Sequence, residues 1–126
     1  MTKKEVLIID DSNTSLVLLE SLLKRYGYKV ISASNGMQGL DLLKKNTPDL
    51  IFLDLKMPVL DGFEFLEKVR KNGDYINIPI VILSAATDSE SIKRGVELGV
   101  TDYLSKPLDP EKVIELTKSI LSDRVK

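Results

Sequence analysis

The chain alternates between two patterns of apolar and polar residues. Short, almost wholly apolar runs are typical of parallel strands buried on both faces, and between them apolar residues recur at helical spacing. The run from Lys29 to Ala33 is more polar, so we expect it near an edge of the sheet. Strands are predicted at residues 5–9, 29–33, 50–53, 80–83 and 102–105.

The segment after the first strand predicts a helix with a defined start and end. Ser12 or Asn13 can serve as its N-cap, and Gly27 suits its C-terminal end. Its apolar positions at helical spacing are Leu16, Leu19, Leu23 and Tyr26.

Turn residues and caps mark the other helices. The second follows the turn signal Asn35-Gly36 and ends near Lys45, because Thr47-Pro48 disfavours helical backbone. The third covers about residues 62–71, and the last begins at Asp109-Pro110, an N-cap followed by proline. The apolar residues expected to be buried are Phe65, Leu66 and Val69 in the third helix and Val113, Leu116 and Ile120 in the last.

The fourth helix is predicted to be the weakest. Thr87 and Glu90 have the spacing of a capping box at its start. Gly95 lies in its interior, where glycine costs about 1 kcal/mol relative to alanine. Five strands alternating with five helices then predict a single α/β domain over residues 1–126, with right-handed crossovers and a parallel sheet covered on both faces.

Composition limits the chemistry that is available. Of 126 residues, 43% are hydrophobic and 29% charged, the balance of a soluble globular protein, and the formal net charge of −1 gives no indication of nucleic-acid binding. The sequence has no Cys and no His, so any metal must be held by oxygen ligands, which favours Mg²⁺. No apolar stretch is long enough for a membrane span and the first residues lack a signal-peptide core, so we expect a cytoplasmic protein.

Polar residues follow several of the predicted strands. In an open parallel sheet, ligands bind outside the carboxyl ends of the strands. The side chains expected at that edge are Asp10, Asp11, Asp54, Ser84 and Lys106. Asp54 is the most informative, because a carboxylate that ends a buried strand needs an open position or a nearby cation.

These five side chains suit phosphoryl transfer. Three carboxylates and one lysine carry a formal charge of −2, which one Mg²⁺ would neutralise. An aspartate can act as a nucleophile and form an aspartyl phosphate. A hydroxyl such as that of Ser84 can hydrogen-bond a phosphoryl oxygen, and Lys106 can neutralise another.

The same residues carry a family resemblance that covers essentially the whole chain. It resembles a response-regulator receiver domain of the chemotaxis-regulator type. The matching segments, in the family's order and spacing, are Asp10-Asp11-Ser12, Leu53-Asp54-Leu55-Lys56-Met57-Pro58, Asp61-Gly62, Ser84-Ala85 and Gly99 to Pro107. The resemblance implies a flavodoxin-like doubly wound sheet of five parallel strands in the order 2-1-3-4-5, with five helices.

The resemblance also implies a role for each site residue. Asp54 would be the phosphoacceptor. Mg²⁺ would be bound by Asp11, by Asp54 and by the backbone carbonyl of Lys56, with Asp10 acting mainly through a metal-bound water. Ser84 and Lys106 would bind the phosphoryl group, and Tyr103 would be an aromatic switch that turns inward as Ser84 moves. The Lys106-Pro107 peptide bond is expected to be cis.

Two positions differ from the commonest pattern of the family. Ser84 replaces the more frequent threonine and lacks the methyl group that restricts the side-chain rotamer. Lys56 and Ala86, each two residues beyond a site residue, offer no acid or amide to orient an attacking water. We therefore predict slow loss of phosphate.

The resemblance implies a single-domain switch in a two-component pathway, which catalyses only its own phosphorylation and dephosphorylation. A histidine kinase or phosphotransfer protein would donate the phosphate, and a protein target would bind the face formed by the fourth helix, fifth strand and fifth helix. Phosphorylation could also drive homodimerisation through the Tyr103 face; no nucleic acid or membrane is expected. The alternatives are a receiver fragment of a larger regulator or hybrid kinase, an aspartyl-phosphate phosphohydrolase, and a pseudo-receiver that never carries phosphate.

Overall fold

The computed structural model describes residues 3–57, 59–84 and 89–122, and in these ranges the predicted alternation is confirmed. The strands are β1 (Glu5–Ile9), β2 (Lys29–Ala33), β3 (Leu50–Asp54), β4 (Ile80–Ser84) and β5 (Asp102–Ser105). The helices are α1 (Asn13–Arg25), α2 (Gly36–Lys45), α3 (Gly62–Arg70), α4 (Ser89–Glu97) and α5 (Pro110–Ser122).

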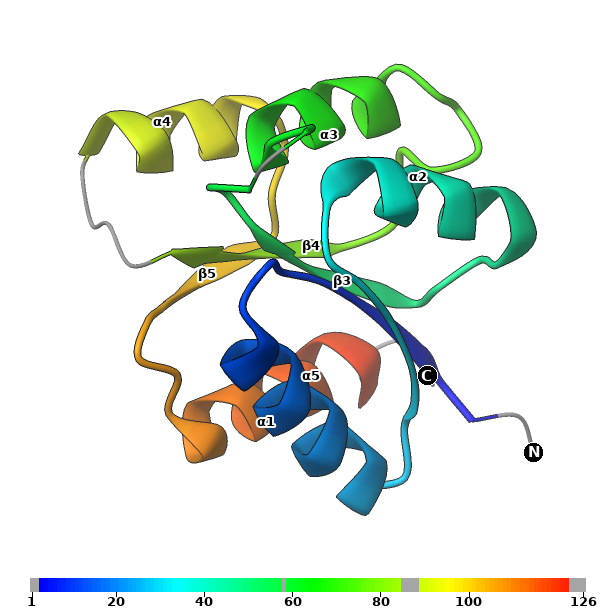
Figure 1. The fold of residues 1–126 in the computed structure, drawn as a ribbon, viewed down its shortest axis with the longest axis vertical. Coiled ribbons are helices and arrows are strands. Elements are labelled where there is room, and N and C mark those ends of the chain that lie inside the picture. The colour runs from blue at the N-terminus through cyan, green and yellow to red at the C-terminus, as the bar shows by residue number, and fades with distance from the viewer. Residues whose placement is uncertain (1–2, 58, 85–88, 123–126) are drawn as a thin grey trace.

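The strands form one parallel sheet in the order β2-β1-β3-β4-β5. Helices α2, α3 and α4 cover one face of this sheet, and α1 and α5 cover the other (Figure 1). The flavodoxin-like doubly wound fold and the edge position of β2 are therefore confirmed. Within the described ranges, no helix has both the length and the apolar character needed to cross a membrane.

Successive side chains of each strand supply two separate cores. In β1, Leu7 and Ile9 pack on the side of α2 and α3, whereas Val6 and Ile8 pack on the side of α1 and α5. Strands β3 and β4 are buried along their whole length, which explains why their sequences are continuously apolar. Phe65 of α3 is one of the largest fully buried side chains, as its helical spacing predicts.

Side-chain caps fix where the helices begin. Of the two candidates for α1, Ser12 is the N-cap and accepts a hydrogen bond from the backbone N–H of Ser15. Helix α3 starts with a complete capping box, in which Asp61 and Glu64 each accept from the other's backbone N–H. Thr87, the expected cap of α4, lies outside the described residues.

In two helices, the residues that are buried differ from those that the apolar spacing predicted. Helix α1 ends at Arg25, so Tyr26 is its C-cap and is 49% exposed instead of extending the buried stripe. In α5, Leu116 and Ile120 are only partly buried. The fully buried residues there include Thr117, whose hydroxyl donates to the carbonyl of Val113 at 2.7 Å. This internal hydrogen bond allows a polar residue to occupy a core position that the apolar pattern assigned elsewhere.

Candidate functional site

The carboxyl ends of the strands bring three acids together. Asp10 directly follows β1, and Asp54 is the last residue of β3, the strand beside it. Carboxylate oxygens of Asp10, Asp11 and Asp54 all lie within 4.8 Å of one another. The acidic cluster predicted for this edge of the sheet is present.

Lys106 is the cation nearest to these acids, and it lies closer to Asp10 than to Asp54. Its Nζ forms an ion pair with Asp10 Oδ2 at 2.9 Å and lies 3.8 Å from Asp54 Oδ2. Asp10 is fully buried and also accepts from the backbone N–H of Ser12 at 2.9 Å. Lys106 therefore compensates the charge of Asp10 more closely than that of Asp54.

The negative charge of Asp54 is consequently only partly compensated by Lys106. The residue is only 6% exposed, and this burial, followed by the charge of Asp10, raises its pKa to about 7. A side-chain hydrogen bond with Asp11 raises the pKa further, whereas Lys106 and the backbone N–H of Lys56 lower it. Near neutral pH, Asp54 can therefore exchange a proton, and any cation that entered the cluster would favour its ionised form.

The backbone behind Asp54 is packed too closely to accept a side chain. Helix α3 begins at Gly62, whose N–H donates to the Leu55 carbonyl at 2.9 Å. A Cβ added at position 62 would lie 2.5 Å from the Asp54 carbonyl oxygen, a distance that real Cβ atoms essentially never show. Glycine at this position thus lets α3 start directly against the end of β3. In the same connection, Val59 has a φ of 71°, a left-handed conformation that is unusual for a β-branched residue.

The last two predicted site residues are joined through the backbone. Ser84 ends β4 opposite Ser105 of β5, and the N–H of Lys106 donates to the Ser84 carbonyl at 2.9 Å. The Lys106-Pro107 peptide bond is cis, as expected. Ser84 is 6% exposed, so its hydroxyl and the Lys106 ammonium lie at the same enclosed edge as the acids.

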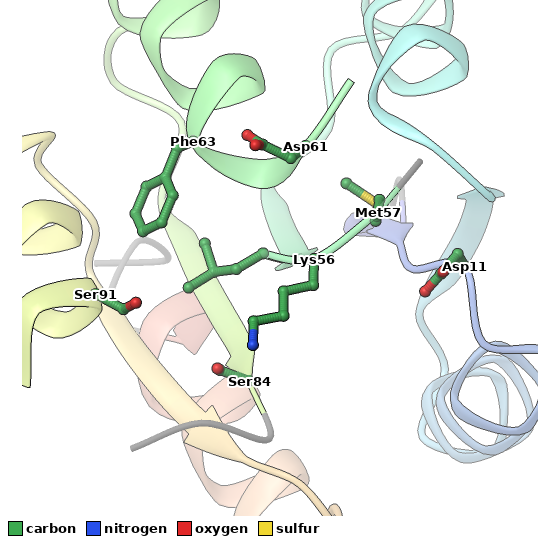
Figure 2. Close-up of a pocket in the computed structure, with 8 residues that line it drawn as sticks. Asp11, Lys56, Met57, Asp61, Phe63, Ser84 and Ser91 are labelled. Carbon is green, nitrogen blue, oxygen red and sulfur yellow. The ribbon is translucent and has the colours of Figure 1, made fainter. Parts of the chain in front are cut away.

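A pocket of about 550 Å³ opens beside the acidic cluster. In Figure 2 the Lys56 side chain extends in the direction of Ser84, while Asp61 projects from the N-cap of α3 and Phe63 from its first turn. The pocket is lined by Asp11, Leu55, Lys56, Met57, Asp61, Phe63, Ser84 and Ser91. Phe63 and Ser91 were not predicted from sequence, because nothing in the local pattern indicates that α3 and α4 meet there.

Tyr103 faces a second, smaller hollow between α4 and β5. Its side chain is partly buried, and its hydroxyl is enclosed without a hydrogen-bond partner among the described residues. Residues Ile92, Val96, Val100, Thr101, Asp102 and Tyr103 line this groove of about 260 Å³. Ala86, the other position expected at the site mouth, lies outside the described residues.

Comparison with known proteins gives one consistent family. The model of the response regulator receiver domain matches residues 6–118. The sporulation initiation phosphotransferase F of Bacillus subtilis is 33% identical over 121 residues, which are 96% of each chain. The chemotaxis protein CheY4 of Vibrio cholerae has a structure with a TM-score of 0.89 and 33% identity, over 94% of this chain and 99% of that one.

Other relatives are longer than this chain. A probable transcriptional regulator, ycf27, of Porphyridium aerugineum is 39% identical over 121 residues, which are 96% of this chain but 49% of the relative. The chain thus spans about half the length of the transcriptional regulators of this kind that it matches.

Proposed function

The chain belongs to the response regulator receiver domain family of two-component systems, and on that basis we propose that it accepts a phosphoryl group on Asp54 and passes the signal on by protein contacts. The observation that carries this proposal is the pairing of a buried, under-compensated Asp54 with Asp10, Asp11 and Lys106 at one sheet edge. Receiver domains are signalling proteins that interact with histidine kinases or phosphotransfer proteins.

The proposed transfer uses side chains that the site already holds. An ionised Asp54 oxygen attacks the phosphorus of the donor, the bond from phosphorus to the donor's imidazole nitrogen breaks, and the electron pair returns to the imidazole. The Lys106 ammonium would offset the new phosphoryl charge, and the Ser84 hydroxyl would donate to a phosphoryl oxygen. A donor imidazole must lie outside these 126 residues, which contain no His.

The acidic cluster also fits a divalent cation. Carboxylates are ligands that Mg²⁺ favours, and burial, followed by the charge of Asp10, raises the pKa of Asp54, so a bound cation would favour its ionised form. We propose that Asp11, Asp54 and the Lys56 carbonyl would hold Mg²⁺, with Asp10 in support. When bound, the ion would supply positive charge that offsets both the carboxylates and the phosphoryl oxygens.

We propose that residues 1–126 act as one receiver domain and that the signal leaves through the α4-β5-α5 face. The enclosed Tyr103 hydroxyl and the groove beside it support this face as the part that responds to Ser84. Both a stand-alone regulator and a receiver within a longer protein have counterparts among the relatives, which are matched over 96% and 49% of their lengths. A phosphorylation-dependent homodimer would use the same face, and sedimentation of the phosphorylated protein tests it.

Intact mass after incubation with acetyl phosphate and Mg²⁺ tests phosphorylation directly. We expect one phosphoryl adduct on the unaltered protein, none on Asp54→Asn, and a strongly reduced yield on Asp11→Asn. Asp61→Asn is a matched control: Asp61 lines the pocket but caps α3, a role that asparagine also fills, so this variant keeps the adduct. An unaltered protein that never gains the adduct would contradict the proposal, and steady breakdown of acetyl phosphate would instead indicate a phosphohydrolase.

Lys56 supports a slow loss of the phosphoryl group. Its side chain lines the pocket mouth and has no acid or amide with which to orient a water molecule. Lys56→Asn introduces an amide there, so we expect the adduct to decay severalfold faster by time-resolved intact mass. A half-life of seconds that Lys56→Asn leaves unchanged would show this reasoning to be wrong.

A further inference from the structure

Helix α4 lines both of the hollows described above, the pocket beside the acidic cluster and the groove beside Tyr103. Ser91 lines the pocket beside the acidic cluster, whereas Ile92 and Val96 line the groove beside Tyr103. A movement of this one helix would therefore change the shape of both hollows. What holds α4 in place then decides how the two hollows are coupled.

The core contributes little to holding α4. Gly95 is the single residue of Ser89–Glu97 that is buried, and Val96 beside it is 66% exposed. A Cβ at position 95 would lie 2.9 Å from Ile82 Cδ1, so the absence of a side chain lets the helix backbone rest on β4. The helix backbone thus rests on the sheet at a glycine, and the large apolar side chain of Ile92 is only half-buried there.

Arg70 fixes the C-terminal end of α4 through backbone carbonyls. Its Nε donates to the Leu98 carbonyl at 3.0 Å, and its Nη2 donates to the Gly99 carbonyl at 2.9 Å. Nη1 donates to the carbonyls of the segment before β4, at Tyr75, Ile76 and Ile78. The planar guanidinium is a fork of fixed geometry, so these bonds tie the end of α4 to α3 at one rigid point.

Arg94 joins the last turn of α4 to α3 in a much weaker way. Its guanidinium lies 4.2 Å from the centroid of the Phe63 ring, and its Nη2 is 3.0 Å from Glu67 Oε1. The Arg94 and Glu67 side chains are 52% and 45% exposed, so solvent screens this pair. Phe63 itself lines the pocket beside the acidic cluster, which places the contact at the wall of the candidate site.

We propose that Arg70 and Arg94 are positioning residues for α4, with Arg70 as a fixed pivot and Arg94 as a contact that releases. When Arg94 leaves Phe63 and Glu67, α4 swings about its C-terminal end and changes the pocket at Ser91 and the groove at Ile92 together. A weak contact suits this role, because a small free-energy input at the pocket can break it. The link between this device and phosphorylation rests on the proposed function, but the device itself does not.

Hydrogen exchange of the unphosphorylated protein tests the releasing contact without any phosphate. We expect Arg94→Gln to speed exchange of the α4 amides about fivefold, as expected for an exposed cation–π contact and ion pair, and to leave β1 and β3 unchanged. Lys93→Gln removes an exposed cation one residue away and should have no effect. Arg94→Lys keeps a cation over the ring and should restore part of the protection.

Two results would contradict the proposal that the contact of Arg94 with Phe63 and Glu67 holds α4 in place. One is equal exchange in Arg94→Gln and Lys93→Gln; the other is faster exchange throughout the sheet, which would mean general destabilisation. Phe63→Leu and Glu67→Gln divide the contact into its two parts, and each should give a smaller increase than Arg94→Gln.

The role of Arg70 as the fixed point of α4 is tested by replacing its guanidinium with the ammonium of lysine, which keeps the positive charge. Arg70→Lys cannot reach five carbonyls, so we expect faster exchange at Leu98, Gly99 and the segment before β4, where Arg94→Gln changes little. Equal protection of this end in Arg70→Lys and the unaltered protein would overturn the pivot.

Phosphorylation kinetics test the coupling to the candidate site. With acetyl phosphate, Arg94→Gln should change the rate of adduct formation severalfold and Lys93→Gln should not; equal rates would overturn the coupling. If the unaltered protein gains no adduct at all, the proposed function fails, and the exchange results alone decide the role of the two arginines.

Discussion

Helices α3 and α4 are each nine residues long and lie on the same face of the sheet (Figure 1), but different forces hold them. Helix α3 buries Phe65, Leu66 and Val69 completely and starts with a capping box. Helix α4 buries only Gly95 within its span and is joined to α3 by two arginines. A helix fixed by its core has one position, whereas a helix fixed by polar contacts can acquire a second.

The same division runs along β3. Its first four residues are apolar and fully buried, and they stabilise the fold. Asp54 at its end is buried as well, but as a carboxylate whose raised pKa reports a free-energy cost. In β3, residues that stabilise the fold thus stand directly next to a carboxylate that destabilises it.

The largest expected effect is a difference between α3 and α4 in how much a buried side chain contributes to stability. Phe65→Ala removes a fully buried ring from α3 and should lower the free energy of unfolding by about 4 kcal/mol, measured by urea denaturation. Val96→Ala removes an exposed side chain from α4 and should change it by less than about 0.5 kcal/mol. If both substitutions lowered the free energy of unfolding by a similar amount, the two helices would not differ in how far the core holds them.

The next effect concerns Asp54 and has a defined sign. Because the folded state holds a proton up to about pH 7 while an unfolded aspartate loses it near 3.8, wild-type stability without divalent cation falls as pH rises through this window. Asp54→Asn cannot ionise, so at pH 8 it should be more stable than wild type by on the order of 3 kcal/mol, and the difference should vanish near pH 4.

The control for this pH dependence is Asp41→Asn. Asp41 is an exposed acid on α2, so its replacement should give no pH-dependent difference in urea denaturation. Mg²⁺ should raise the stability of the wild type at pH 8 and leave Asp54→Asn nearly unchanged. A stability difference between Asp54→Asn and wild type that grew toward low pH would have the wrong sign for a raised pKa.

The smallest effect tests the connection that joins β3 to α3. Val59 is 77% exposed and holds a left-handed backbone, so Val59→Gly loses little packing and relieves strain. After the entropy that glycine adds to the unfolded chain, a gain of about 0.5–1 kcal/mol should remain. Val59→Ala keeps its Cβ and should show no comparable gain in thermal or urea denaturation; equal behaviour of the two variants would exclude strain at this residue.

Much of the fold could be predicted because strands and acids share one pattern. The apolar runs of β1 and β3 each end in aspartate, and parallel strands bring such ends to the same edge. The polar composition of β2 predicted its edge position in the same way. These features are local in sequence, so periodicity and strand order were sufficient.

The missed features depend on contacts between distant segments. Arg70 bonds carbonyls at residues 75–78 and 98–99, and a backbone carbonyl leaves no trace in the sequence. The contact of Arg94 with Phe63 joins two exposed helical positions that look like ordinary surface. Thr117 replaced an expected apolar residue in the α5 core because its hydroxyl bonds within its own helix.

The order in which the site residues occur along the chain has a consequence for synthesis. Asp10 and Asp54 belong to the first half of the chain, whereas Lys106, which pairs with both, follows the last strand. A nascent chain that has emerged only as far as β4 therefore carries two acids at the sheet edge without their cation. The ribosome must complete nearly the whole domain before Lys106 can compensate these two acids.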